Sequence, residues 1–322
     1  MLVGARWSAA LVAVVLAAGC SSGGDDASDT TTSSSTSTVV PAGSDGCGAP
    51  RPEVDEQHLA PATVESSGGT RDYMVYVPEA YDPDVPAPVA YVFHGAGSNK
   101  EQQLAYSGYA PNADEAGALL VLPDALGTPK RWSPLGPAFA GVEGVDDLDF
   151  FDDLSAAIAA SFCVDAERVL VTGMSSGGFM SGSVACARSD QITAAGPVTA
   201  TVWAEPICGN AEPLAYSYFH GTADPVVPYD GGPNSPGPVL ETIQAWADQN
   251  GCTGEPVDER IGEEVVHRSW HGCDAPTDLY TVEGGGHTWP GAIDVGLGHT
   301  TDDIDATELI WQMFEDTWPD SD

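Results

Sequence analysis

Three residues far apart in the chain have the types and local settings needed for nucleophilic acyl-transfer chemistry. Ser175 lies in a Gly-x-Ser-x-Gly string, Asp224 lies in the string His-Gly-Thr-Ala-Asp-Pro, and His287 follows three glycines. A serine hydroxyl becomes a good nucleophile only when a nearby base takes its proton. An imidazole oriented by a carboxylate is such a base, so the order serine, aspartate, histidine predicts a catalytic triad.

The flanks of the serine string strengthen this prediction. An apolar run at 169–172 precedes it and a helical stretch at 177–188 follows it, as a sharp strand-turn-helix elbow requires. Glycines on both sides of the serine meet the steric demand of such a turn. The alternative is a Gly/Ser-rich loop that merely caps a helix, because short glycine strings also arise by chance in a chain with 37 glycines.

The acid and the base each have rivals. These are Asp230 for the acid, and His271 and His299 for the base. Asp224 follows the strand-like run 216–219, although it could also be a turn-forming Asp-Pro. His287 is preferred because only this histidine follows both a strand-like run, 280–282, and a glycine run.

An acyl-transfer site also needs backbone N–H groups that bind the oxyanion of the transition state. Ser176, directly after the nucleophile, is predicted to supply one of them. The second is predicted in the loop after the strand-like run 88–93, where Ala96 is the preferred donor and Gly97 the alternative. His94, at the start of this loop, is expected to be structural.

Other residues suggest a pocket and argue against a metal. Trp132 and Trp289 are candidates for lining an aromatic-tolerant pocket, with burial in the core as the alternative. The acidic run between Glu143 and Asp153 lacks the alternating pattern of a calcium loop, so we expect it to complement a helix dipole. No cysteine and histidine spacing fits zinc, and we expect neither a metal nor a cofactor.

Short strand-like runs alternate with helical stretches from about residue 47 onward. The strand-like runs are 73–77, 88–93, 119–122, 169–172, 214–219 and 279–282, and the helical stretches are 149–161, 177–188, 238–249 and 303–318. Near-continuous apolar strands suit a buried parallel sheet, and the alternation predicts helices on both of its faces. Residues 47–322 are therefore predicted to form one catalytic domain of the α/β class.

The N-terminal region predicts export. Arg6 and a short apolar run, Ala9–Ala18, indicate a signal peptide over residues 1–19, because the run is too short to span a bilayer. The run ends in Ala-Ala-Gly-Cys, which resembles a bacterial lipobox and predicts acylation of Cys20; ordinary cleavage, with this cysteine incidental, is the alternative. Residues 20–46 are rich in Ser, Thr and Asp, which predicts a flexible tether. We expect a lipoprotein on the outer face of the membrane, or a secreted protein.

The composition limits the partners. Acidic residues number 48 against 10 Lys plus Arg, a net charge of −38, which repels nucleic acid. Adaptation to a salty medium and simple solubility both fit this charge. We expect an ester substrate, membrane contact only through the N-terminal lipid, and no obligate protein partner. Besides Cys20 there are six cysteines, which in an exported chain predicts three disulfides of unspecified connectivity.

Together these residues resemble the polyhydroxybutyrate depolymerase and feruloyl esterase-like family of α/β hydrolases, which includes actinobacterial esterase lipoproteins. The matching stretches are His94–Gly97, Val145–Asp147, Arg168–Gly178, His220–Tyr229 and Gly284–Gly291, spread over residues 70–318. The resemblance implies the α/β-hydrolase fold and a secreted, cofactor-free serine esterase acting through an acyl-enzyme. Its substrates would be hydroxyalkanoate oligomers or polyesters, or feruloyl and acetyl esters. It also implies the pairs Cys47–Cys163, Cys186–Cys208 and Cys252–Cys273.

The chain departs from this family's pattern in two ways. Ser176 stands where these enzymes often have asparagine, but the backbone N–H does the chemistry, so we expect activity to survive. No polymer-binding module follows the predicted catalytic domain, which argues against solid polyester as the substrate. The alternative functions are a serine peptidase of the same fold and a non-catalytic, surface-anchored binding protein.

Overall fold

The computed structural model describes residues 43–134, 142, 144–200, 202, 208–209, 211–232, 235 and 237–318. The predicted signal peptide, Cys20 and most of the predicted tether lie outside these residues. Residues 43–46 were assigned to the tether, but they bond to the domain: the Ser44 hydroxyl donates to the Phe162 carbonyl (2.6 Å) and the Gly46 N–H to the Ala159 carbonyl (2.8 Å). The folded unit therefore includes these residues, and the predicted boundary at residue 47 is a few residues late.

A ten-stranded sheet forms the centre of the described domain, in the order β1-β2-β4-β3-β5-β6-β7-β10-β9-β8. The strands are β1 (Leu59–Ser66), β2 (Gly69–Tyr76), β3 (Ala87–Phe93), β4 (Leu119–Pro123), β5 (Val164–Met174), β6 (Ala194–Val198), β7 (Ala215–Gly221), β8 (Val257–Ile261), β9 (Val265–Ser269) and β10 (Thr277–Val282). The six central strands, β4, β3, β5, β6, β7 and β10 in their order in the sheet, are parallel. Strands β1 and β2 at one edge and β9 and β8 at the other pair antiparallel. The carboxyl ends of the parallel strands consequently meet at one edge of the sheet.

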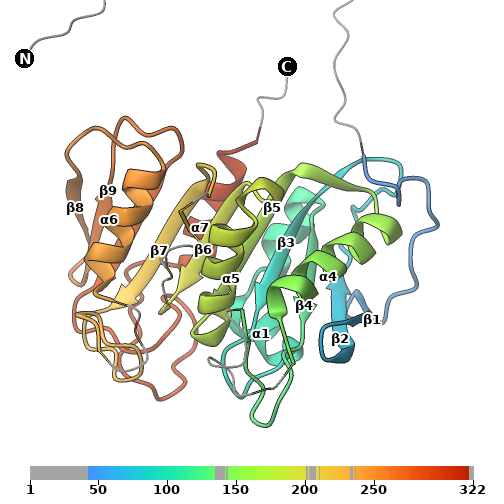
Figure 1. Cartoon of the computed structure of the whole chain (residues 1–322), viewed down its shortest axis with the longest axis horizontal. Coiled ribbons are helices and arrows are strands. Elements are labelled where there is room, and N and C mark those ends of the chain that lie inside the picture. Colours follow the sequence, from blue (N-terminus) through green and yellow to red (C-terminus); the bar gives the residue numbers. More distant parts are fainter. Residues whose placement is uncertain are drawn as a thin grey trace, which may run out of the picture. The chain divides into compact units, whose positions relative to one another are not determined.

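Helices cover both faces of this sheet (Figure 1). They are α1 (Lys100–Ser107), α2 (Ala110–Ala116), α4 (Asp147–Ser161), α5 (Ser176–Ala187), α6 (Val239–Gln249) and α7 (Ala306–Glu315), with a 3-10 turn at Ser189–Gln191. Along β3, Tyr91 and Phe93 pack toward α4, α5 and α6, while Ala90 and Val92 pack toward α2 and α7. This alternation follows from the two-residue period of a strand and gives one apolar core on each side of the sheet.

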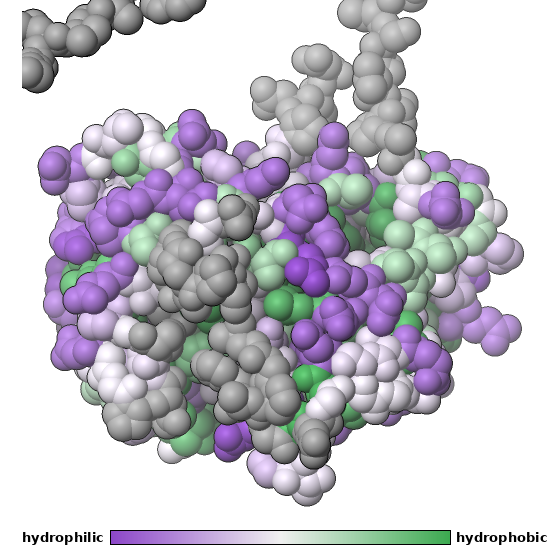
Figure 2. All heavy atoms as spheres, in the orientation of Figure 1, coloured by the Kyte–Doolittle hydropathy of each residue, from purple (hydrophilic) through white to green (hydrophobic). Residues whose placement is uncertain are grey.

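The described surface over α4 and α6 is mainly polar. Figure 2 shows hydrophilic side chains spread over this face, with hydrophobic side chains in smaller patches between them. None of the helices in the described ranges is long and apolar enough to cross a bilayer.

The predicted fold class is confirmed. Each of the six predicted strands and four predicted helices overlaps an observed one, with boundaries that differ by up to five residues. The three disulfides are Cys47–Cys163, Cys186–Cys208 and Cys252–Cys273, the pairing that the resemblance implied.

The acidic run has structural roles where it is described; Glu143 lies outside the described residues. Asp146 is the N-cap of α4 and accepts the N–H groups of Leu148 (2.9 Å) and Asp149 (3.4 Å), as the expected helix-start role requires. Asp147 is fully buried and bonds to Arg71 Nη2 (2.8 Å).

Candidate active site

Ser175 lies at a tight turn between β5 and α5, with a φ of 54° and a ψ of −119°. Its N–H donates to the Val198 carbonyl of β6 (2.9 Å), which fixes the turn to the neighbouring strand. A Cβ atom on Gly173 would lie 2.5 Å from the Phe93 carbonyl oxygen, and one on Gly177 would lie 2.0 Å from it. Only glycine fits at these two positions, so the backbone has the geometry of a nucleophile elbow.

The predicted acid and base come together at the same edge of the sheet. Asp224 follows β7 and His287 follows β10, and these two strands are parallel neighbours. The His287 Nδ1 atom lies 2.7 Å from Asp224 Oδ2, and the residue is 3% exposed. With Nδ1 turned to the carboxylate, Nε2 is the nitrogen available to the serine, which lines the same pocket.

Asp224 is held as a carboxylate by several donors. Its Oδ1 accepts the N–H groups of Val226 (2.7 Å) and Val227 (2.9 Å), and His220 Nε2 lies 3.3 Å from Oδ2. Burial opposes ionisation, but the hydrogen bonds from His220 and His287 outweigh it and lower the pKa of the carboxyl well below its usual range. The group therefore stays charged beside the imidazole. His220 is a contact that the sequence analysis did not anticipate.

The rival residues differ from this pair in their exposure. Asp230 is exposed. His299 is half exposed and pairs with Glu264 (2.8 Å), and His271 is exposed. The His299 main chain nonetheless supports the base, because its carbonyl accepts the Gly286 N–H (2.8 Å) next to His287.

In the loop after β3, the two candidate oxyanion donors differ in their hydrogen bonds. The Gly97 N–H is occupied, because it donates to the Lys130 carbonyl (2.8 Å). No acceptor within the described ranges takes the Ala96 N–H, and Ala96 lines the same pocket as Ser175. The N–H of Ser176 belongs to the first turn of α5, where N–H groups lack helical acceptors. The geometry therefore favours Ala96 and Ser176.

His94 fixes the start of this oxyanion loop, residues 94–99. Its Nε2 accepts the Ala125 N–H (3.0 Å), so Nδ1 carries the proton and donates to the Gly95 carbonyl (2.7 Å). Burial is the main cause that lowers the pKa of this imidazole, which favours the neutral form. His94 is structural, as the sequence analysis expected.

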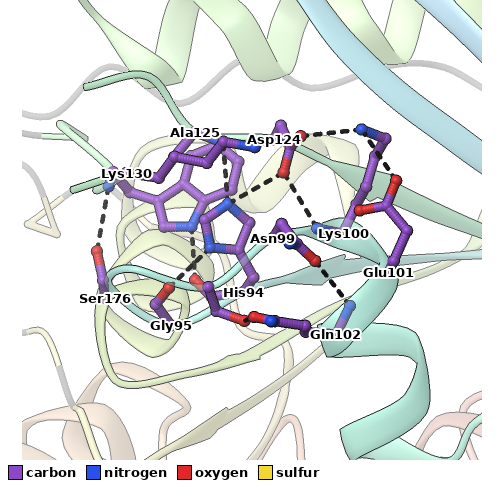
Figure 3. A network of polar contacts seen from close by, with 12 residues as sticks. His94, Gly95, Asn99, Lys100, Glu101, Gln102, Asp124, Ala125, Lys130 and Ser176 are labelled. Atoms are coloured by element: carbon purple, nitrogen blue, oxygen red, sulfur yellow. Dashed lines mark hydrogen bonds and ion pairs between the residues drawn. The ribbon is translucent and has the colours of Figure 1, made fainter. Parts of the chain in front are cut away.

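A buried carboxylate, which the sequence analysis did not single out, fixes the other end of the loop (Figure 3). Asp124 accepts the Lys100 N–H (3.0 Å) and pairs with the ammonium groups of Lys100 (2.9 Å) and Lys130 (2.5 Å). These are the two lysines of the whole sequence. Burial raises the pKa of Asp124, but hydrogen bonds from Lys130 and Lys100 outweigh it and lower the pKa overall. One carboxylate thus connects the end of this loop, at Lys100, to Lys130, whose carbonyl accepts the Gly97 N–H.

The Asp124→Asn variant should lower kcat for a soluble ester about tenfold to a hundredfold while KM changes less than about twofold. A neutral amide binds the two ammonium groups more weakly than a carboxylate does. The loop that carries the Ala96 N–H is then held less firmly in position. Steady-state kinetics and thermal unfolding measure the two effects separately. Asp152→Asn, which breaks the ion pair with Arg188 on another part of the surface, is the matched control. A lower Tm with unchanged kcat would show that Asp124 supports only the fold.

A pocket of about 530 Å³ contains the proposed triad serine and histidine. Its described lining is mostly apolar and has no Asp, Glu, Lys or Arg; it consists of Gly95, Ala96, Ser98, Gln102, Gln103, Ala105, Tyr106, Met174, Ser175, Val226, His287, Ile293, Val295 and Leu297. Four of these, Val226, Ile293, Val295 and Leu297, are exposed hydrophobic residues. On a chain with a net charge of −38, this neutral, apolar pocket is suited to an uncharged substrate.

The two tryptophans do not line this pocket, so that prediction is wrong. Trp132 is 2% exposed and its Nε1 donates to the His94 carbonyl (2.8 Å), while its N–H donates to Ser176 Oγ (3.1 Å). Trp289 is 1% exposed and its Nε1 donates to Thr307 Oγ1 (3.0 Å). Each indole finds its partner in the interior, which is the alternative left open for them.

Comparisons with known proteins agree with this fold. No protein-family model matches the chain. It is 28% identical over 287 residues to feruloyl esterase D of Neurospora crassa (85% of this chain, 90% of that protein), and 26% identical over 280 residues to a probable feruloyl esterase C of Aspergillus niger (85% and 91%). Among solved structures, an acetyl xylan esterase from Aspergillus awamori matches with a TM-score of 0.58 at 16% identity, covering 71% of this chain and 94% of that one.

The sheet order, the elbow and the fold similarity define an α/β hydrolase. Within this fold the chain is similar to feruloyl esterases, and it is a carboxylic ester hydrolase.

Proposed function

We propose that this protein is an exported serine esterase that cleaves neutral carboxylic esters through Ser175, His287 and Asp224. The observation that carries the proposal is the 2.7 Å contact between His287 and Asp224 in a pocket whose wall includes the serine of a nucleophile elbow. Each residue follows a different parallel strand, so the fold itself supports their convergence.

The reaction follows from these positions. Ser175 Oγ attacks the ester carbonyl carbon while its proton passes to His287 Nε2, and the Ala96 and Ser176 N–H groups bind the oxyanion. The tetrahedral intermediate collapses, the carbon–oxygen bond to the alcohol breaks, and His287 returns the proton to the leaving alcohol. Water then attacks the acyl-enzyme by the same route and releases the acid. Asp224 keeps the imidazole oriented and stabilises its positive charge.

The substrate class is supported by the lining and by the relatives. A neutral, apolar pocket with exposed hydrophobic residues in its wall suits aryl or short acyl esters, and it offers no charged group to hold a peptide terminus. The curated relatives are named feruloyl esterases. Feruloyl and acetyl esters are therefore our first substrates, and soluble hydroxyalkanoate oligomers are the second.

The same proposal includes export and anchoring. Three disulfides are typical of an oxidising compartment, which supports a location outside the cytosol. The sequence Ala-Ala-Gly-Cys supports acylation of Cys20, with the segment up to the domain acting as a tether.

The test is hydrolysis of methyl ferulate, p-nitrophenyl acetate and hydroxybutyrate oligomers, with and without prior treatment by diethyl p-nitrophenyl phosphate. We expect release of acid from at least one ester, complete loss after treatment, and a diethylphosphoryl mass on the peptide containing Ser175. Peptide mass mapping identifies the labelled residue. Rates equal to buffer for every ester, or an adduct on a different serine, would contradict the proposal.

A further inference from the structure

A second imidazole lies beside the carboxylate of the proposed triad. His220 belongs to β7 and is 1% exposed. Its Nε2 atom lies 2.8 Å from the Val227 carbonyl oxygen and 3.3 Å from Asp224 Oδ2. A carbonyl oxygen can only accept a hydrogen bond, so Nε2 carries a proton. This single N–H group therefore faces two acceptors of the turn that follows β7.

The other nitrogen of the His220 ring is also bonded. The Tyr218 hydroxyl forms a hydrogen bond with His220 Nδ1. Residues two apart on a strand lie on the same face of the sheet, which brings the phenol beside the imidazole. Burial raises the pKa of the Tyr218 phenol well above its usual range, so the phenol keeps its proton. In a neutral imidazole that carries its proton on Nε2, Nδ1 accepts from this phenol, which fixes the tautomer.

His220 reaches the Asp224 carboxylate by two routes. The direct route is the contact of Nε2 with Oδ2. The indirect route runs through Val227, whose carbonyl accepts from His220 and whose N–H donates to Asp224 Oδ1 (2.9 Å). Oδ2 is also the atom that lies 2.7 Å from His287 Nδ1. The carboxylate that orients the proposed base is therefore held by His220 at one oxygen directly and at the other through Val227.

We propose that His220, fixed by Tyr218, is a positioning residue that keeps Asp224 Oδ2 aimed at His287 Nδ1. This inference rests on the proposed esterase function and extends its machinery to two residues of β7. In the described part of the chain His220 does not line the catalytic pocket, so it acts through the carboxylate and not on the substrate. Its loss should misalign the base while the substrate pocket stays intact, and a small misalignment of a catalytic group costs much in rate.

The first test compares two replacements of His220. His220→Met removes the donor, whereas His220→Gln places an amide N–H group near the position of Nε2. With p-nitrophenyl butyrate, the methionine variant should lose about tenfold to a hundredfold in kcat while KM changes less than about twofold. The glutamine variant should recover kcat to within about fivefold of the parent, because a donor is present again. His220→Asn, whose shorter amide does not extend to the position of Nε2, replaces the methionine variant if that variant does not fold.

A double-mutant cycle tests the connection to Tyr218. Tyr218→Phe alone should lower kcat about threefold to tenfold, since the imidazole loses the donor that fixes its tautomer. In the His220→Met background, the same replacement should lower kcat by less than about twofold, because the phenol acts only through the imidazole. Equal losses in the two backgrounds would overturn the role assigned to Tyr218.

His267→Met is the matched control. His267 is also a histidine bonded to an aspartate of the same sheet, since its Nε2 lies 2.7 Å from Asp278 Oδ1, but it belongs to β9 and does not contact Asp224. Its kcat should stay within about twofold of the parent value. Thermal unfolding of every variant separates a loss of stability from a loss of rate.

The outcomes distinguish this inference from the esterase proposal. A folded His220→Met variant with the parent kcat, or equal losses in the methionine and glutamine variants, would overturn the positioning role while leaving the esterase intact. Absence of hydrolysis in the parent, together with absence of labelling of Ser175 by diethyl p-nitrophenyl phosphate, would instead refute the esterase proposal.

Discussion

Replacing Ser175 by alanine is expected to lower kcat for p-nitrophenyl butyrate by about a millionfold, with little change in KM. The variant keeps the pocket, the oxyanion donors and the His287–Asp224 pair, but it has no oxygen to form the acyl-enzyme. Its fold should be retained, because the side chain that changes is partly exposed and the Ser175 N–H still bonds to Val198. Initial rates at enzyme concentrations high enough to detect the residual activity measure this loss.

Ser181→Ala is the matched control for this experiment. Ser181 lies on the same helix, α5, and its hydroxyl donates to the Gly178 carbonyl (3.1 Å) rather than to any predicted site residue. Its kcat should remain within about twofold of the parent value, since a single neutral hydrogen bond contributes only about 1 kcal/mol to folding. Retention of more than about one hundredth of the parent rate in Ser175→Ala would show that another residue is the nucleophile.

The common edge of the sheet at which the three proposed triad residues lie could be predicted because each follows a strong strand signal. The apolar runs before Ser175, Asp224 and His287 fix three parallel strands, and parallel strands end at one edge of a sheet. No tertiary information is needed for that step. The sequence did not supply the distance between the acid and the base, which depends on bonds between the two loops such as Ala223 N–H to the Gly285 carbonyl (2.9 Å).

Several elements could not be predicted, for identifiable reasons. Strand β6 contains Pro197 and consists of small residues, and proline within a run argues against a central strand. Strands β8 and β9 form an edge hairpin; β8 is rich in charged residues and β9 has only two apolar residues, so they lack a clear apolar pattern. Helix α1 has the sequence Lys-Glu-Gln-Gln-Leu-Ala-Tyr-Ser, too short and polar to show a helical period.

The supporting residues of the site were missed for a related reason. Asp124 stands in no recognisable motif, and its importance comes from contacts with segments that are distant in sequence. Trp132 and Trp289 are candidates because of their residue type. Their burial is decided by acceptors for the indole N–H, His94 and Thr307, which no local pattern reveals.

The Asp224→Asn variant is expected to lower kcat by about ten-thousandfold. The amide can present an N–H group to His287 Nδ1, which favours the tautomer with the proton on Nε2. The imidazole then cannot accept the serine proton, and the positive charge that it would gain has no carboxylate beside it. Steady-state kinetics on p-nitrophenyl butyrate measure the loss. A decrease in stability of about 1–3 kcal/mol should accompany it, because the buried group loses charge-assisted hydrogen bonds.

Asp230→Asn tests whether the effect belongs to this position. Asp230 is the rival acid of the same loop, but it is exposed, so its amide variant should keep kcat within about twofold of the parent. The rate of labelling by diethyl p-nitrophenyl phosphate is a second measurement. Asp224→Asn should react slowly with this reagent at Ser175, since the reaction also requires an activated hydroxyl, while Asp230→Asn should react at the parent rate. If a folded Asp224→Asn enzyme kept more than about a tenth of the parent kcat, a different group would have to orient His287. His220, whose Nε2 lies 3.3 Å from Asp224 Oδ2, would be the first residue to examine.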